Sequence, residues 1–372
     1  MEKNFTKEES GSGAKKKSFI VRNERILSFA FFIAGFVFDA VTLTRVTVLE
    51  ASLILGIYLA VIAVCIVLYN AVGSRTFPGS RLRKSVSWIP FLIQFMFGTL
   101  LNASFIFFTE SAEIATSWPF LTFLALIVLS NEVLHRKRDR LTFQLTVFFV
   151  SELLYFALVV PILVGKMGSF IFILSGLISV IVLMLLAWLL SRFAGERYIE
   201  GRKLRVFIIF SVYAIVNVLY FTNIIPPIPL ALKSVGVYHT IAKISGGYKV
   251  EYEPETSPFV FWRKESGIFH AASGDSAYLF SAIFAPTSLT VPVLHEWSYF
   301  DQEKKVWVVT NRIKYIIEGG RDAGYRGYSK KDNITPGSWR VVIMTEQGQR
   351  IGSVYFTVIS SATPPVLKSE DK

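Results

Sequence analysis

Long apolar runs fill the first 226 residues of the chain and then stop. Seven of them approach or exceed the roughly 20 residues that an α-helix needs to cross the hydrocarbon core of a bilayer. They lie at about 26–44, 48–72, 87–108, 113–134, 141–164, 167–191 and 204–226. The pattern predicts an α-helical membrane bundle of about seven transmembrane helices.

From about residue 248 the pattern changes to alternation. In residues 306–318, VWVVTNRIKYIIE, apolar side chains such as Trp307 and Ile317 alternate with polar ones, which is typical of a half-buried strand. Pro336 and Gly337 form a turn dipeptide between two further candidate strands. Six to eight short strands of this kind predict an all-β antiparallel sandwich of immunoglobulin-like size.

Prolines mark the junction between the two patterns. Pro226, Pro227 and Pro229 end the last apolar run, and apolar side chains then recur at roughly helical intervals up to Ile244. Two interpretations remain open: an amphipathic segment on the membrane surface, or a linker that packs beneath the domain. The predicted parts are a basic cytoplasmic tail (1–25), a transmembrane domain (26–226), an interfacial linker (227–247) and an extracytoplasmic β-sandwich (248–372).

Composition supports the membrane class. The 372 residues are 52% hydrophobic and only 18% charged, whereas soluble domains carry about a quarter charged residues. A single cysteine, Cys65, lies in an apolar run, so the chain has no internal disulfide.

Charge is distributed in a way that indicates an orientation. Residues 1–234 hold 23 Lys and Arg against 13 Asp and Glu, while residues 235–372 hold 16 against 14. The basic loops, including residues 75–84 and 135–140, alternate along the chain with loops poor in Lys and Arg. The positive-inside rule therefore predicts a cytoplasmic N-terminus, and seven crossings place the β-sandwich outside the cytoplasm. A near-neutral exported domain argues against a nucleic-acid partner.

One ionisable residue, Glu152, is predicted near the middle of a span. At that depth an acid marks a transport or proton-relay site, or is a protonated group bonded to a neighbouring helix. Four amides of the apolar runs could supply its hydrogen-bond partner: Gln94, Asn102, Gln144 and Asn217. Glu152, Gln94 and Asn217 are the intramembrane candidates.

Local catalytic motifs are not found. The sequence contains no Walker, HExxH or GxSxG motif and no Cys/His metal spacing, so no catalytic residue, cofactor or metal is predicted. His295 and Glu296 lie next to Trp297, where a packed pair is favoured over an acid–base dyad.

The segment from Gly319 to Arg340 interleaves cations and aromatic residues. In one interpretation it is turn chemistry between strands, with Trp339 in the core. In the other it is an exposed patch that holds an anion or stacks on a sugar. The candidate ligand-binding residues are Arg321, Tyr325, Arg326, Tyr328 and Lys330.

Several motifs in the C-terminal part occur in a characteristic order. They are FSAIFAP followed by HEW, then GGRDAGYRGYS, PGSWRV and GQRIG. Over about residues 260–360 the sequence resembles the bacterial C-terminal family called domain of unknown function 2914. NIIPPIPLALKSVGVYH also resembles the junction that precedes this domain in multi-spanning relatives. The resemblance implies a bacterial envelope protein and brings no activity and no functional residues.

The sequence thus favours a multi-pass protein of the bacterial inner membrane, not an enzyme, whose sandwich binds an envelope ligand or partner. The expected partners are the lipid bilayer and an envelope glycan, an anionic ligand or a membrane protein. The alternative is a transporter or membrane-embedded enzyme centred on Glu152, with the sandwich as an accessory domain.

Overall fold

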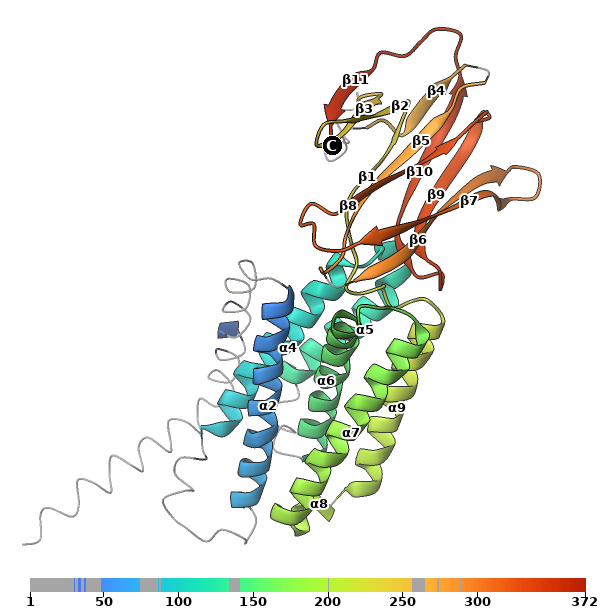
Figure 1. Ribbon diagram of the computed structural model, residues 1–372. Helices are drawn as coiled ribbons and strands as arrows, with labels where there is room; N and C mark the ends of the chain where they lie inside the picture. The colour runs from blue at the N-terminus through green and yellow to red at the C-terminus, as the bar shows by residue number, and fades with distance from the viewer. Residues whose placement is uncertain are drawn as a thin grey trace, which may run out of the picture. The chain divides into compact units, whose positions relative to one another are not determined.

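The structure is a computed structural model (Figure 1). It describes residues 48–73, 88–133, 141–199, 201–255, 265–272, 274–287 and 289–372, with a few isolated positions before residue 87. The chain divides into a helical unit, which comprises Met1–Ile106, Leu121–Val159 and Ile173–Val218, and a second unit. The second unit comprises Leu219–Lys372 together with the segments Phe107–Phe120 and Val160–Phe172.

The described residues form six long helices and one short one. They are α2 (Val48–Gly73), α4 (Ile89–Glu110), α5 (Ile114–Val133), α6 (Leu141–Val164), α7 (Ser169–Phe193), α8 (Glu196–Ile199) and α9 (Arg202–Phe221). Five of them are long and apolar enough to cross a membrane, and in α5 the apolar part covers only Ile114–Val128. The apolar helical part of the prediction is therefore confirmed. The first predicted run, 26–44, lies almost wholly outside the described residues, so the count of seven stays a prediction.

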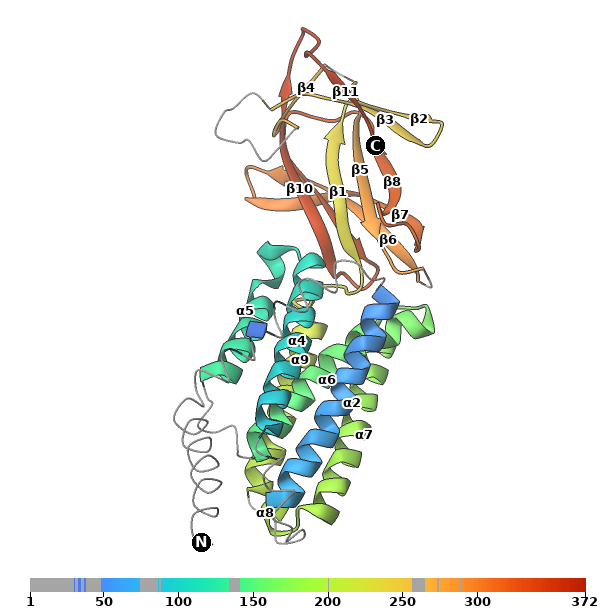
Figure 2. The ribbon, with the colours of Figure 1, turned by 90° about the vertical axis from the view of Figure 1, so that its left-hand side faces the viewer.

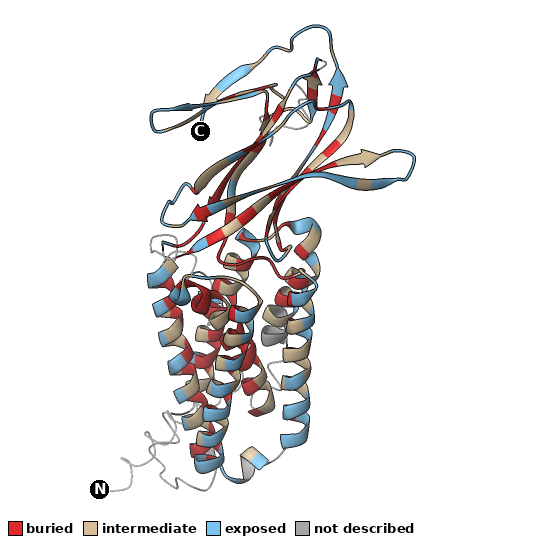
Figure 3. Cartoon of the chain, turned by 45° about the vertical axis from the view of Figure 1, so that its right-hand side comes forward, coloured by how far each residue is buried: buried red, intermediate tan, exposed pale blue. Residues whose placement is uncertain are grey.

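Helix α6 occupies the centre of the helical unit. In its most apolar stretch 72% of the residues are buried, against 33% in α7 and 17% in α9 (Figure 3). Asn70 on α2 donates a hydrogen bond to Gln144 on α6 over 2.9 Å. Gly56 on α2 lets the Tyr155 ring of α6 approach closely, since a Cβ at Gly56 would meet the phenol oxygen at 2.5 Å. The outer helices keep apolar side chains exposed, as lipid-facing helices do.

Eleven strands follow in the described part of the chain (Figure 2). They are β1 (Ala231–Tyr238), β2 (Thr240–Ile244), β3 (Gly247–Tyr252), β4 (Ile268–Ala271), β5 (Ala277–Phe284), β6 (Thr290–Asp301), β7 (Val306–Glu318), β8 (Tyr325–Lys331), β9 (Gly337–Thr345), β10 (Arg350–Ser360) and β11 (Lys368–Asp371). They build a three-stranded sheet β1-β5-β8, a five-stranded sheet β4-β10-β9-β6-β7 and a small sheet β11-β3-β2.

The first two sheets form a sandwich. Buried residues of β5, such as Leu279 and Ile283, share one apolar core with Trp297 of β6, Val341 of β9 and Phe356 of β10. The small sheet covers the outer face of β1-β5-β8 through a second apolar cluster, which consists of Tyr238, Val250, Tyr252, Phe280 and Ala282. The predicted sandwich is thus present, with an additional small sheet.

Two details of the prediction are corrected. Strand β4 pairs with β10 in parallel, so the sheets are not purely antiparallel. The segment 227–247 contains β1 and β2 and forms no amphipathic helix. Helix α9 ends at Phe221, before the three prolines, and the chain turns at Asn223, which has a φ of 57°. Residues 231–238 then pair with residues 278–284 of β5, so backbone hydrogen bonding to β5 overrides the helical spacing of the apolar side chains.

Candidate functional site

The Gly319–Arg340 segment is half turn and half strand. A turn brings the chain to β8, and Gly324 at φ 88° permits it. A Cβ at Gly324 would lie 2.9 Å from the backbone nitrogen of Ile283 on the neighbouring strand. Glycine is needed there because the backbone is left-handed and the strands are in close approach.

The strand alternation separates the five candidate residues. Arg326, Tyr328 and Lys330 share the outer face of β8, because they pair with Ala282, Phe280 and Tyr278 of β5. Tyr325 packs instead against the sandwich core. Arg321 precedes the strand and lies over the Tyr325 ring, with its Cζ 5.1 Å from the ring centroid. The structure therefore brings three of the five candidates onto one face.

Two further tyrosines complete this face. The Tyr328 ring lies 5.7 Å from the Tyr248 ring of β3 and 6.5 Å from the Tyr278 ring of β5. Lys330 Nζ lies over the Tyr278 ring at 5.8 Å. Tyr328 is 46% exposed. We call these five residues the β8 patch: Tyr248, Tyr278, Arg326, Tyr328 and Lys330.

Both cations of the β8 patch already have partners. Lys330 forms a 2.7 Å ion pair with the exposed Asp332, and this contact raises the pKa of the lysine. Arg326 donates one hydrogen bond to the carbonyl of Gly246. Its guanidinium makes no ion pair with any residue that the structure describes. An anion or a sugar hydroxyl can therefore approach Arg326 beside an exposed tyrosine ring.

His295 lies at the centre of a polar network inside the sandwich. Its Nε2 is 3.0 Å from both Ser281 Oγ and the Tyr315 hydroxyl, and its Nδ1 is 2.9 Å from Ser329 Oγ. The Trp297 indole nitrogen donates to the same Ser329 oxygen. Gly327 makes room for this arrangement, because a Cβ there would lie 2.6 Å from the Tyr315 ring.

The network is neutral and closed to solvent. Burial lowers the pKa of His295 to about 3 and raises the pKa of Tyr315 above its ordinary value. Ser281, His295 and Ser329 are almost completely buried, so an external substrate has no access to Ser281. Glu296 points to the other face of β6 and pairs with Arg312 at 2.7 Å. The side chains of the adjacent His295 and Glu296 therefore lie on opposite faces of β6 and form no acid–base dyad.

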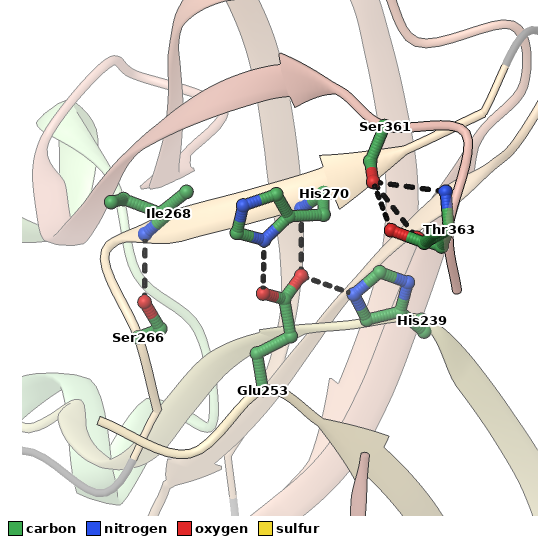
Figure 4. A network of polar contacts seen from close by, with 7 residues as sticks. All are labelled: His239, Glu253, Ser266, Ile268, His270, Ser361 and Thr363. Atoms are coloured by element: carbon green, nitrogen blue, oxygen red, sulfur yellow. Dashed lines mark hydrogen bonds and ion pairs between the residues drawn. The ribbon is translucent and has the colours of Figure 1, made fainter. Parts of the chain in front are cut away.

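A second histidine cluster escapes sequence inspection because its members are far apart in the chain. Glu253 accepts hydrogen bonds from His239 Nε2 at 2.8 Å, from His270 Nδ1 at 2.6 Å and from the His270 backbone at 2.7 Å (Figure 4). His239 also stacks on Phe269. Partial burial raises the pKa of Glu253, but the bonds from His270 and His239 outweigh it and hold that pKa below its usual value.

This cluster, called the Glu253 clasp, joins three elements. His239 lies between β1 and β2, Glu253 follows β3, and His270 belongs to β4 of the five-stranded sheet. It fastens the small sheet to the sandwich. Among the described residues no group of three or more His, Cys, Asp or Glu side chains is arranged to hold a metal ion.

The intramembrane candidates behave differently from one another. Asn217 donates to the carbonyl of Tyr213 on its own helix. Glu152 and Gln94 are completely buried, and their side-chain oxygens and nitrogen find no hydrogen-bond partner among the residues described. Gln144, one of the amides considered for Glu152, is bonded to Asn70. An unpaired buried carboxylate carries a large desolvation penalty, so its presence requires an explanation.

Fold and sites together define a protein with apolar helices of membrane-spanning length and a C-terminal β-sandwich. Residues 291–358 of this sandwich match the family described as "Protein of unknown function (DUF2914)". The match runs from β6 into β10 and confirms the resemblance seen in the sequence. No curated protein matches the chain.

Solved structures give only distant likenesses. An immunoglobulin-like protein from Pseudomonas aeruginosa has 8% identity and a TM-score of 0.19, covering 33% of this chain and 97% of its own. A β-glucosidase from Kluyveromyces marxianus has 9% identity and a TM-score of 0.16, with 37% and 15% covered. The alkylpurine DNA glycosylase AlkC of Pseudomonas fluorescens has 11% identity and a TM-score of 0.21, with 81% and 97% covered. None of these scores supports a functional argument.

Proposed function

We propose that this chain is a multi-pass protein of the bacterial inner membrane whose β-sandwich is an extracytoplasmic binding module. In this proposal seven helices cross the membrane, the N-terminus is cytoplasmic, and the sandwich binds a ligand of the cell envelope without catalysing a reaction. The concentration of Lys and Arg in alternate loops supports the orientation. The family match supports the assignment of the sandwich to a domain type, although it carries no activity.

The observation that carries the proposal is the β8 patch. It places an exposed tyrosine, two neighbouring tyrosine rings and two cations on one face of an edge strand. Aromatic rings offer large rigid contact area with a polar group at one end, and a guanidinium can hold a carboxylate or phosphate through two parallel bonds. A glycan or another anionic envelope component fits both features. Nucleic acid does not fit a domain whose charges nearly cancel.

The test uses the full-length protein in lipid nanodiscs. Lipopolysaccharide, peptidoglycan fragments and anionic lipids are the probes, and binding is measured by biolayer interferometry. We expect the double variant Arg326→Gln with Tyr328→Ala to weaken binding of the recognised probe about tenfold, because both a charged bond and a stacking surface are lost. Lys304→Gln, an exposed charge change in the β6–β7 turn, is the matched control. Equal binding by all three proteins would exclude the β8 patch as the site.

A second candidate function rests on Glu152 and Gln94. Two completely buried polar side chains on α6 and α4 that lack partners among the described residues suit a site for a proton, a cation or a polar solute. In this alternative the helical unit transports, or catalyses a reaction within the membrane, and the sandwich is accessory. The two candidates are separated by phenotype in cells that depend on the protein. Loss of function in Glu152→Gln, with full function in the β8-patch double variant, would favour the membrane site.

A further inference from the structure

The outer face of the five-stranded sheet carries a second site where a cation lies beside aromatic residues. Tyr355 of β10 pairs with Arg340 of β9, and Arg340 pairs with Ser298 of β6. The three side chains therefore form a row across neighbouring strands on one face, because directly paired residues point to the same side of a sheet. This face is opposite to the one that contributes Trp339 to the sandwich core.

Trp307 of β7 lies across this row. Its ring is 4.8 Å from the Arg340 Cζ and 5.9 Å from the Tyr355 ring, and it is 5.2 Å from the ring of Phe300. Tyr355 is 48% exposed, while Trp307 and Arg340 are half-buried. We call Ser298, Trp307, Arg340 and Tyr355 the Trp307 platform. Ser298 and Trp307 belong to the β6–β7 hairpin, which projects beyond the rest of the sheet (Figure 1), and Arg340 and Tyr355 belong to β9 and β10.

Two polar groups of the platform are unsatisfied. Arg340 Nε and Ser298 Oγ are buried, and neither has a hydrogen-bond partner among the residues that the structure describes. Ser298 is completely buried. The guanidinium of Arg340 also makes no ion pair in the described part of the chain, and only the indole ring stacks on it.

Neighbouring charges on the same sheet are paired. Arg312 bonds to Glu296 at 2.7 Å, and Lys314 bonds to Glu346. Glu296, the acid nearest in sequence to Ser298, is already paired with Arg312 and is not a partner of Arg340. Arg340 therefore keeps an unneutralised positive charge on this face. Ser298 Oγ and Arg340 Nε are sealed beneath this surface, so a ligand would meet the charge of Arg340 rather than these two atoms.

We propose that the Trp307 platform binds an acidic saccharide unit. The flat apolar side of a sugar ring would cover Trp307 and Tyr355, and its carboxylate would accept the N–H donors of Arg340. A simple carboxylate would leave both rings uncovered, and an apolar peptide would bury the guanidinium unpaired, which is costly.

This site is separate from the β8 patch. The two lie on the outer faces of different sheets of the sandwich, and they share no residue. The inference rests on the proposed function only in that it assumes the sandwich faces the envelope, where acidic saccharides occur. It can therefore fail while the β8 patch still binds its own ligand.

The experiment measures binding of saccharides by the full-length protein in nanodiscs with isothermal titration calorimetry. The probes are a hexamer of galacturonic acid, a neutral glucose hexamer and acetate. We expect the acidic hexamer to bind the wild-type protein at least tenfold more tightly than either other probe. Arg340→Gln should reduce that affinity at least tenfold, and Tyr355→Ala should reduce it severalfold.

Two variants guard against misfolding. Arg340→Lys keeps the charge and the aliphatic contacts but loses the planar fork, so it should bind more weakly than wild type and fold normally. Trp307→Leu keeps an apolar side chain on the outer face and should lose affinity for the acidic hexamer. Lys304→Gln and the β8-patch double variant should bind it as the wild type does.

Four results would overturn the inference. One is an acidic hexamer that binds no more tightly than the neutral one, and another is an affinity that no platform variant changes. Loss of binding in the β8-patch variant alone would move the ligand to that patch and leave the proposed function standing. A lower oligomer mass in Trp307→Leu, with no saccharide binding by the wild type, would make the platform a contact between copies of this chain.

Discussion

His295 shows how a polar side chain can be accommodated in a sandwich core. Each ring nitrogen has a hydroxyl partner, so burial leaves no unsatisfied group on the imidazole. The cost falls on the charged form, which is why the pKa of His295 drops to about 3. The residue is therefore a fixed neutral component of the core at physiological pH.

This burial makes the sandwich sensitive to acid. An unfolded histidine binds a proton near pH 6.5, whereas His295 in the folded chain stays neutral down to about pH 3. Between these values stability falls as pH falls, by up to about tenfold in the unfolding equilibrium constant per pH unit. Thermal unfolding of the sandwich, followed by tryptophan fluorescence from pH 7 to pH 5, should show this slope.

The variant His295→Gln should be less stable at pH 7 but have a flatter pH dependence. His270→Gln serves as the control, because His270 is 38% exposed and lies in the other histidine cluster. An unchanged slope in His295→Gln would show that other groups cause the acid sensitivity.

Gly327 gives a second prediction at this scale. Gly327→Ala places a methyl group against the Tyr315 ring, and we expect it to lower the free energy of unfolding by about 1–3 kcal/mol. Chemical denaturation would measure it. Because the ring is the obstacle, the added cost should shrink in a Tyr315→Leu background. Equal cost in both backgrounds would contradict the packing account.

The candidate ligand-binding residues show how far the positions of single side chains can be predicted from the sequence. Arg326, Tyr328 and Lys330 occupy alternate positions, so a strand assignment alone would have placed them on one face and Tyr325 on the other. Tyr248 and Tyr278 could not be added to them, because strand pairing between distant segments is not encoded locally. The same reason hides the Glu253 clasp, whose members span residues 239–270.

At the scale of elements, the segment after the membrane helices is the clearest difference between expectation and structure. Periodicity in residues 230–244 is compatible with a helix, but β1 gains a complete antiparallel ladder with β5. Short apolar segments are ambiguous between helix and strand, and tertiary pairing decides between them. The alternating residues 306–318, by contrast, are long enough to predict β7 with its correct bounds.

The small sheet β11-β3-β2 should depend on the Glu253 clasp. Glu253→Gln removes the charge that accepts three bonds from two histidines, and we expect faster hydrogen exchange in β2 and β3 at pH 7. Acid should have the same effect in the wild type. Because the pKa of Glu253 is lower in the folded chain, its ionised carboxylate stabilises the folded state at pH values above the unfolded pKa near 4.3. This stabilisation is lost as the pH falls through the folded pKa.

Glu251→Gln is the control for this prediction. It changes a carboxylate on β3, two residues before Glu253, and that carboxylate accepts a hydrogen bond from the exposed Thr240. Exchange that rises equally in both variants would mean that the clasp has no special part in holding the sheet.

At the scale of the whole molecule, the change from long apolar runs to alternation divides the chain correctly into helical and β-rich parts. Helices of this length can be predicted directly from the sequence, because a helix that faces lipid needs a continuous run of apolar residues. The sheet order is not, since it depends on contacts between strands distant in the chain. The orientation in the membrane is a prediction from loop charge, and both binding proposals depend on it.

The side of the membrane on which the sandwich lies is therefore the most direct test of the account. Cys65, the single cysteine, is replaced by alanine, and one new cysteine is introduced by Lys304→Cys in the exposed β6–β7 turn or by Ser10→Cys in the N-terminal tail. A maleimide that does not cross the inner membrane is added to spheroplasts. We expect labelling of Lys304→Cys in intact spheroplasts and of Ser10→Cys only after lysis. The reverse pattern would place the sandwich in the cytoplasm and contradict the proposed function.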